Sequence, residues 1–84
     1  MLNMIVYAIY NKQCDKIYIG ITADLERRLK EHNLKLGTHF TARYEGNWMV
    51  IYQENCINKK EALKRERQLK SYQGRLFVKK HIPS

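Results

Sequence analysis

The feature that most constrains the fold of this chain is an unbroken apolar run at residues 4–10. The run consists of β-branched, aromatic and other apolar side chains, and neither of its faces is polar. A strand with this pattern is buried on both sides, so it belongs in the centre of a sheet whose two faces are both covered. A chain of 84 residues has room for one such core, which predicts a single domain over residues 1–84.

Two further strands are predicted to join this run. Residues 16–19 follow a short polar turn, which indicates a returning hairpin strand that ends at Gly20. Residues 48–52 form another apolar run after a polar loop and are expected to be the third strand. Three strands in this order predict a small antiparallel sheet.

Three amphipathic segments are predicted to be helices. The first has Thr22 as its N-cap and stops at Gly37. The second begins at Asn58, with Glu61 three residues later as in a capping box, and Gly74 separates it from a last short helical piece. The expected order is β-β-α-β-α-α, an α+β fold in which helices flank a three-stranded antiparallel sheet.

The net charge of +8 is concentrated towards the end of the chain. Residues 59–84 carry nine basic and two acidic side chains, a net +7, whereas residues 1–58 carry seven basic and six acidic, a net +1. Such a segment attracts a polyanion by neutralising phosphates and releasing counterions, although a solvated helix face has the same composition. Because the segment also has an apolar stripe and belongs to the fold, we expect contact with nucleic acid.

The cysteines and the hydropathy restrict the compartment. Cys14 and Cys56 form neither a disulfide framework nor a zinc set, which fits a reducing cytoplasm, or a nucleus if the source is eukaryotic or viral. No apolar run approaches the roughly 20 residues of a membrane span, and no signal-peptide pattern precedes the first strand. We expect a cytoplasmic protein that does not enter a membrane.

One charged residue interrupts the apolar stripe of the second helix. Glu66 lies four residues after Ala62 and three before Leu69, with Leu63 also in the stripe. Burying a carboxylate costs free energy unless a cation or hydrogen bonds compensate it. Glu66 therefore either leans outwards to pair with a surface lysine or faces a cleft as an acid/base group or metal ligand. One carboxylate can hold a single Mg²⁺ that keeps several waters and takes its other ligands from phosphate.

The first helix places a basic pair beside its apolar stripe. Arg28 comes three residues after Leu25 and four before His32, while Arg27 points about 100° away towards solvent. An arginine and a histidine aligned in this way can together meet a phosphate. An arginine beside an apolar stripe also commonly extends its head group to solvent, so both interpretations stay open.

Two tyrosine triplets complete a larger pattern. Residues 5–7 are Ile-Val-Tyr and, after ten intervening residues, residues 18–20 are Tyr-Ile-Gly. This pair resembles the signature of the GIY-YIG nuclease superfamily, and in particular its small stand-alone members, although Ile5 stands where the motif has glycine. Residues 20–33 are similar to the family's helix with arginine and histidine, and residues 61–70 to its segment with a metal-binding glutamate. The resemblance covers essentially the whole chain in order.

The resemblance implies a metal-dependent endonuclease that hydrolyses DNA phosphodiester bonds, in repair or recombination, with one Mg²⁺ or Mn²⁺ ion. By similarity, Tyr7 would activate the attacking water, and Tyr18 would help to position that water or a phosphate oxygen. Arg28 would stabilise the developing negative charge, His32 would follow one helical turn later, and Glu66 would bind the ion.

The same resemblance implies further contacts with DNA. Lys70 or Ser71 is the candidate for a polar group that the family has late in the domain, and the loop with His39, Thr41 and Arg43 is expected to reach substrate. Together with the basic segment, this gives the candidate DNA-binding residues His39, Arg43, Lys64, Arg67, Lys70 and Arg75.

Two other classes of protein fit the same composition. A basic nucleic-acid-binding module with little or no catalysis would bind DNA in a salt-dependent way without metal-dependent turnover. An adaptor whose basic helix docks an acidic protein would be displaced by heparin but not by DNA. We expect no separate DNA-targeting domain, so affinity must come from residues 59–84 or from a targeting partner protein, and we expect a monomer or a weak dimer.

Overall fold

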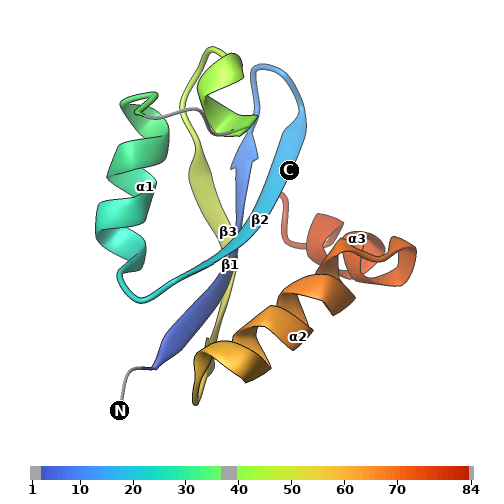
Figure 1. Cartoon of the computed structure of the whole chain (residues 1–84). Coiled ribbons are helices and arrows are strands. Elements are labelled where there is room, and N and C mark those ends of the chain that lie inside the picture. Colours follow the sequence, from blue (N-terminus) through green and yellow to red (C-terminus); the bar gives the residue numbers. More distant parts are fainter. Residues whose placement is uncertain (1–2, 37–39, 84) are drawn as a thin grey trace.

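The computed structural model describes residues 3–36 and 40–83 and has three layers (Figure 1). The middle layer is a three-stranded antiparallel sheet with one helix on one side and two helices on the other. Its strands are β1 (Met4–Asn11), β2 (Lys16–Thr22) and β3 (Met49–Cys56), in the order β2-β1-β3. The predicted α+β class and element order are confirmed.

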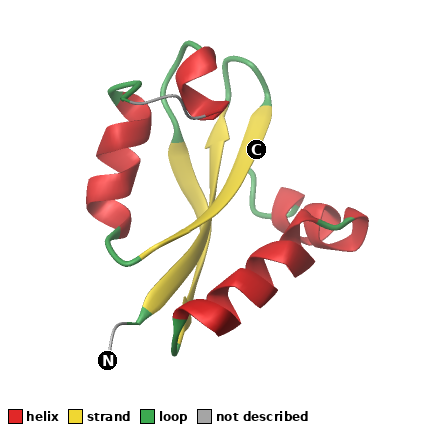
Figure 2. Ribbon diagram, viewed as in Figure 1, coloured by secondary structure: helices red, strands yellow, loops and turns green. Residues whose placement is uncertain are grey.

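The helices lie on both faces of this sheet, as the ribbon coloured by secondary structure shows (Figure 2). Helix α1 (Leu25–Asn33) and the short 3₁₀ turn η1 (Phe40–Arg43) lie on one side. Helices α2 (Lys59–Lys70) and α3 (Tyr72–Lys79) lie on the other. Within the described residues, none of these helices has the length and apolar character needed to cross a bilayer.

Strand β1 occupies the centre because it is apolar on both faces. Successive side chains of a strand point to opposite faces, so Val6 and Ala8 join the core under α2 and α3, while Tyr7 and Ile9 point towards α1. All four residues are at most 1% exposed. The prediction of a central strand buried on both sides is confirmed.

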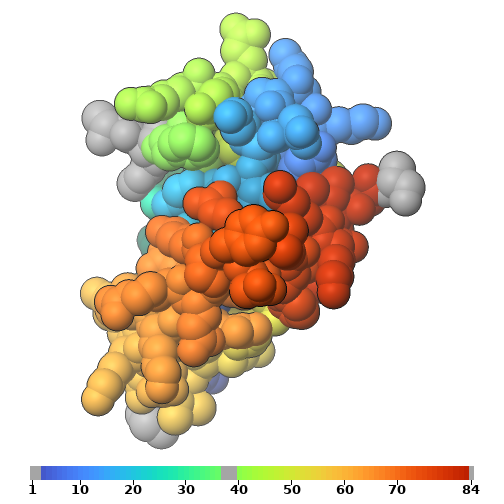
Figure 3. All heavy atoms as spheres, turned by 90° about the vertical axis from the view of Figure 1, so that its right-hand side faces the viewer, coloured from blue at the N-terminus to red at the C-terminus, as the bar shows by residue number. Residues whose placement is uncertain are grey.

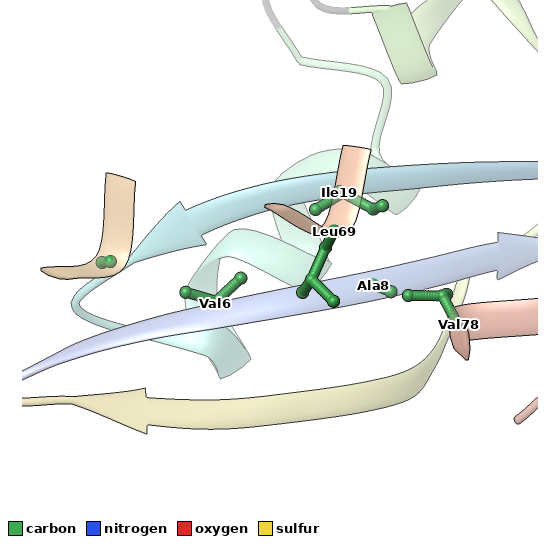
Figure 4. Close-up of a cluster of buried hydrophobic side chains, with 6 residues drawn as sticks. Val6, Ala8, Ile19, Leu69 and Val78 are labelled. Atoms are coloured by element: carbon green, nitrogen blue, oxygen red, sulfur yellow. The ribbon is translucent and has the colours of Figure 1, made fainter. Parts of the chain in front are cut away.

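The core on the α2 and α3 side joins the sheet to both helices (Figure 4). Leu69 comes from the last turn of α2 and Val78 from α3, so the last helix is part of the core. Burying an aliphatic side chain of this size stabilises a fold by roughly 1.5–3 kcal/mol. The buried members of this cluster are Val6, Ala8, Ile19, Ala62, Leu69 and Val78.

Strands β2 and β3 are both longer than the sequence predicted. Gly20 does not end β2, which continues to Thr22, because Gly20 pairs with Tyr7 of β1 inside the ladder. Strand β3 continues past residue 52 to Cys56, because β1 pairs with it over that length. Pairing with the central strand determines where β2 and β3 end. This pairing cannot be deduced from the side-chain pattern of either strand alone.

Helix α1 begins later and ends earlier than predicted. Its N-cap is Asp24 and not Thr22, because the Asp24 carboxylate accepts a hydrogen bond from the Arg27 amide at 3.1 Å. At the other end, the Lys35 and Leu36 amides bond back to carbonyls of the last turn in a Schellman pattern. Lys35 adopts the left-handed backbone, with φ of 59°, that this pattern requires. The predicted stop at Gly37, which lies outside the described residues, is therefore two residues too late.

Helix α2 begins as predicted, but the stripe of side chains that it buries against the sheet is narrower than predicted. The Asn58 side chain accepts a hydrogen bond from the Glu61 amide at 2.9 Å, which confirms Asn58 as the N-cap. Leu63 was expected in the buried stripe, yet it is 42% exposed. Ala62 and Leu69 are the residues of α2 that the sheet buries, so the stripe is narrower than expected.

Gly74 lies inside α3 and does not separate it from the preceding helix. Helix α3 starts directly after Ser71, and its first turn packs on the end of α2. A Cβ atom on Gly74 would lie 2.5 Å from Leu69 Cα and would overlap the carbonyl oxygen of Gln68. Glycine is used here because two helix backbones approach too closely for a side chain.

We expect Gly74→Ala to lower the free energy of unfolding by about 1–3 kcal/mol, because the added methyl group forces the backbones apart. The effect opposes the intrinsic helix propensity, which favours alanine over glycine by about 1 kcal/mol. Urea unfolding followed by circular dichroism measures it. The control is Gln73→Ala, an exposed position of the same turn where a change within about 0.5 kcal/mol is expected. Equal stability of the two variants would contradict this account of the helix junction.

Candidate active site

Three rings from different elements meet on the α1 side of the sheet. Tyr7 of β1 and Tyr18 of β2 point to this face, with their ring centroids 6.3 Å apart. His32 of α1 packs against both, with centroid distances of 6.0 Å to Tyr7 and 5.1 Å to Tyr18. The sheet and α1 thus bring together three of the residues that the sequence singled out.

A chain of short hydrogen bonds runs through the middle of this cluster. The Tyr7 hydroxyl lies 2.9 Å from His32 Nε2, and His32 Nδ1 lies 2.6 Å from the Thr41 hydroxyl. All three residues are at most 2% exposed. When Nδ1 carries the proton and donates to Thr41, Nε2 accepts the proton of the Tyr7 hydroxyl. The contact with Thr41 is therefore compatible with the tautomer in which His32 acts as an acceptor for Tyr7.

Gly20 leaves the space that the two phenols occupy. It pairs with Tyr7 across the β1–β2 ladder. A Cβ atom at this position would lie 2.9 Å from the Tyr7 hydroxyl oxygen and 2.9 Å from Cε2 of Tyr18. Any residue other than glycine would push one of the two rings out of place.

The structure distinguishes Arg28 from its neighbour Arg27. The Arg28 side chain is 22% exposed and that of Arg27 is 70% exposed, as the helical phase of α1 predicts. Arg28 Nη1 donates to the Glu31 carboxylate at 2.9 Å. Burial alone would lower the pKa of the Arg28 guanidinium, but hydrogen bonding to Glu31 and Tyr7 outweighs it and raises the pKa. Arg28 therefore brings a permanent positive charge to the tyrosine cluster.

Burial raises the pKa of Tyr7 to about 12. Hydrogen bonding with Arg28 acts in the opposite direction, and the charges of Tyr18 and Glu66 add to the increase. The phenol is thus protonated at neutral pH. Tyr7 can accept a proton there only if its own proton leaves at the same time, and His32 Nε2 is the acceptor within hydrogen-bond distance.

The structure shows the first of the two interpretations of Glu66, an ion pair with a lysine of the same helix. Its carboxylate pairs with Lys70 at 3.3 Å, and its side chain is 20% exposed. Its charge also contributes to the raised pKa of Tyr7, so α2 brings this carboxylate within electrostatic reach of the tyrosine cluster. The packing of α2 against both β1 and β2 makes this approach possible.

Among the described residues, Glu66 does not belong to a larger cluster of metal-binding side chains. Across residues 3–36 and 40–83, no three histidine, cysteine, aspartate or glutamate side chains are grouped to hold a metal ion. One carboxylate does not make a cage, but it fits an ion such as Mg²⁺ that keeps several waters and completes its shell with phosphate oxygens. The donor set is thus compatible with a hard divalent cation that binds together with a phosphate substrate.

The candidate DNA-binding residues of the two last helices fall into two groups. Lys64 and Arg67 line a shallow hollow on the outer surface of α2. Lys70 and Arg75 line a separate hollow next to Tyr18. All four side chains are exposed, but the second pair alone lies beside the tyrosine cluster.

The loop that was expected to reach substrate contains both an exposed and a buried residue. Arg43, at the end of η1, is exposed. Thr41 is 1% exposed and its hydroxyl lies against His32, so this member of the loop is part of the interior. His39 lies outside the described residues.

The chain matches the family model of the GIY-YIG catalytic domain over residues 3–80. It belongs to this family. The match confirms the resemblance carried by the two tyrosine triplets, the Arg-His helix and the glutamate segment. Ile5, which replaces the first glycine of the family signature, packs at the margin of the aromatic core under α1.

The chain is also similar to several UPF0213 proteins. The chain is 38% identical over 77 residues to a UPF0213 protein of Desulfotalea psychrophila, covering 84% of this chain and 69% of the relative. It is 35% identical over 66 residues to a UPF0213 protein of Haloquadratum walsbyi, covering 76% and 73%. The solution NMR structure of a UPF0213 protein from Bacillus halodurans superposes with a TM-score of 0.53 and 28% identity, over 90% of this chain and 81% of that one.

The raised pKa of Tyr7 predicts a late step in tyrosine ionisation. Ultraviolet titration of the six tyrosines should show one that ionises near pH 12, and Tyr7→Phe should remove that step. Because the folded-state pKa lies above the ordinary value of 10, the contribution of the protonated phenol to stability is complete below about pH 10. It is lost as pH rises to about 12, by about 3 kcal/mol. A late step that persists in Tyr7→Phe but disappears in Tyr72→Phe, which removes an exposed tyrosine, would contradict this assignment.

The contact between Thr41 and His32 predicts a change of tautomer when the hydroxyl is removed. Thr41→Val should lower the population of the Nδ1-protonated form of His32, and should lower the free energy of unfolding by about 1–2 kcal/mol. Thr41→Ser keeps the hydroxyl and should retain the tautomer. Long-range ¹⁵N–¹H NMR spectra of the imidazole report the tautomer directly. An unchanged His32 spectrum in Thr41→Val would show that another group selects it.

Proposed function

We propose that this GIY-YIG domain is a metal-dependent endonuclease that hydrolyses DNA phosphodiester bonds, acting in the cytoplasm in repair or recombination. The observation that carries the proposal is the meeting of Tyr7, Tyr18, Arg28 and His32, with the charge of Glu66 acting on Tyr7. Phosphodiester hydrolysis needs a proton acceptor for water, a cation for the developing negative charge and a site for the leaving oxygen. This cluster supplies side chains suited to each task.

In the proposed reaction, a water molecule attacks phosphorus in line with the leaving oxygen. Its proton passes to the Tyr7 oxygen as the Tyr7 proton passes to His32 Nε2, while a new oxygen–phosphorus bond forms. The bond from phosphorus to the leaving oxygen breaks, and that oxygen takes up a proton from solvent. Because the pKa of Tyr7 is raised, its phenol is protonated at neutral pH, so it takes up the proton of water only as it passes its own to His32.

Arg28 and Tyr18 act on the phosphate in this proposal. The Arg28 guanidinium donates to the non-bridging oxygens, where negative charge gathers in the transition state. Tyr18, which is only partly buried, orients the water or a phosphate oxygen. Glu66 would hold one Mg²⁺ or Mn²⁺ ion, which would supply Lewis-acid stabilisation of the leaving oxygen. Cutting both strands needs a second copy or two successive events, because the described part of the chain contains one such cluster.

The test is nicking of supercoiled and branched DNA with Mg²⁺. Arg28→Lys keeps the charge but loses the planar fork, and Glu66→Gln keeps the shape but loses the charge. Each is expected to lower the cleavage rate by about 10²–10³-fold. The matched controls are Arg27→Lys on the exposed side of α1 and Glu61→Gln at the start of α2, and both should cleave at the wild-type rate. EDTA should abolish cleavage, and Mg²⁺ or Mn²⁺ should restore it.

Equal cleavage by wild type, Arg28→Lys and Glu66→Gln would overturn the proposal, because a contaminating nuclease would then explain the activity. Salt-dependent DNA binding with no metal-dependent cleavage by wild type would instead support a binding module. The net +7 of residues 59–84 favours that second candidate.

A further inference from the structure

We infer that the hollow beside Tyr18 binds one unstacked nucleobase, and that the groove next to it holds the neighbouring phosphates. The inference rests on the proposed function for the kind of polymer that binds, and adds to it a base-binding subsite. The hollow has a volume of about 230 Å³. It is lined by Ile17, Tyr18, Ile19, Phe40, Lys70 and Arg75.

The size and lining of this hollow suit a flat, aromatic group. Pockets that enclose drug-sized ligands have roughly 300–1,000 Å³, so this one fits a smaller fragment such as a single base. The rings of Tyr18 and Phe40 lie nearly parallel, with 21° between their planes and 6.2 Å between their centroids. Aromatic faces of this kind stack on bases without strong preference for sequence. Because β2 is an edge strand, Ile17 and Ile19 add apolar surface beside the two rings.

Two cations stand beside the aromatic surface. Arg75 Nε donates to the backbone oxygen of Lys70 at 3.1 Å, which holds the guanidinium against the end of α2. Lys70 itself pairs with Glu66 at 3.3 Å, so the hollow adjoins the proposed metal ligand. An apolar aromatic surface next to positive charge matches a nucleotide, in which a planar base is joined to an anionic phosphate.

The hollow continues along β2 into a second one of about 340 Å³, with which it shares Ile17, Phe40 and Arg75. The other lining residues of this second hollow are Asp15, Lys16, Lys79 and Ile82. The three cations of this hollow, Lys16, Arg75 and Lys79, outnumber its one carboxylate, Asp15. This excess of positive charge favours binding of a run of phosphates. In the space-filling view, β2 lies between the segment after residue 40 (green) and the two last helices (orange and red) (Figure 3). Two adjoining hollows that share part of their lining accept a polymer more readily than a free nucleotide.

Tyr18 connects this groove to the tyrosine cluster. Its ring lies 5.1 Å from His32 and 6.2 Å from Phe40, measured between centroids, so it belongs to both places. A base stacked at Phe40 therefore lies next to the phosphate that Arg28 and Tyr7 would act on. A base inside a duplex is covered by its neighbours and its partner, so the hollow takes a base of a single strand or one turned out of a duplex.

The experiment measures binding of the full chain to fluorescein-labelled oligonucleotides by anisotropy, in EDTA so that no cleavage occurs. One single-stranded probe carries normal bases, and a second of equal length has abasic residues at its centre and the same phosphates. Wild type is expected to bind the first about 5- to 150-fold more tightly. Phe40→Ala should remove most of this preference and Phe40→Trp should keep it. Arg75→Ala should weaken binding of both probes alike and reduce the salt dependence.

Tyr72→Ala is the control, because Tyr72 is an exposed aromatic residue of α3 outside both hollows and should leave the preference unchanged. Circular dichroism checks the fold of each variant. If Phe40→Ala fails to fold, Phe40→Leu keeps apolar volume without the ring and takes its place. A duplex with one bulged base, compared with the fully paired duplex, distinguishes a base turned out of a duplex from one in a single strand.

Equal affinity of wild type for the normal and abasic probes, or a preference that Phe40→Ala retains, overturns the inference. Base-dependent binding without cleavage in Mg²⁺ would overturn the proposed nuclease and leave the base site in place. Cleavage in Mg²⁺ without any base preference would overturn the base site and leave the proposed nuclease in place.

Discussion

Because both faces of β1 are buried, the Tyr7 hydroxyl lies in the interior, and the fold must supply it with a polar partner. His32 of α1 is that partner, and Thr41 of η1 in turn contacts the second nitrogen of the same imidazole. The hydrogen bonds that compensate one buried phenol therefore tie together the sheet, α1 and η1. Gly20 belongs to the same constraint, since only a residue without a side chain leaves room for the phenol across the ladder.

Much of this arrangement could be predicted because its causes are local in sequence. The double-sided apolar run placed β1 in the centre, and helical phase selected Arg28 over Arg27 and marked Glu66 as unusual. The tyrosines needed the family resemblance, since apolar strands commonly contain tyrosine. The features that the sequence did not predict depend on contacts between distant segments. The extent of β2 and β3 follows from pairing with β1, the use of Gly74 follows from a helix–helix approach, and the burial of Thr41 follows from the packing of η1 on α1.

The folded structure also changes how the basic segment, residues 59–84, is interpreted. As a sequence, residues 59–84 suggest one continuous docking surface with a net charge of +7. In the structure, these charges lie on separate surfaces: Lys64 and Arg67 line a different hollow from Lys70 and Arg75. Arg65 is used within the fold, where its Nε donates to both carboxylate oxygens of Glu54 in β3. The part of the charge beside the tyrosine cluster is therefore much smaller than the total, which makes position more important than net charge.

The pairing of Glu66 with Lys70 links the proposed ion site to the proposed base site. A carboxylate paired with an ammonium group has a weaker attraction for a cation, so an ion at Glu66 must compete with Lys70. Lys70 also lines the hollow beside Tyr18, where an incoming phosphate offers it a new anionic partner. Phosphate bound there would draw Lys70 away from Glu66 and would increase the affinity of Glu66 for the proposed ion. In the proposed reaction each event would thus favour the other, and a single carboxylate would be sufficient for an ion that has to be present only with the substrate.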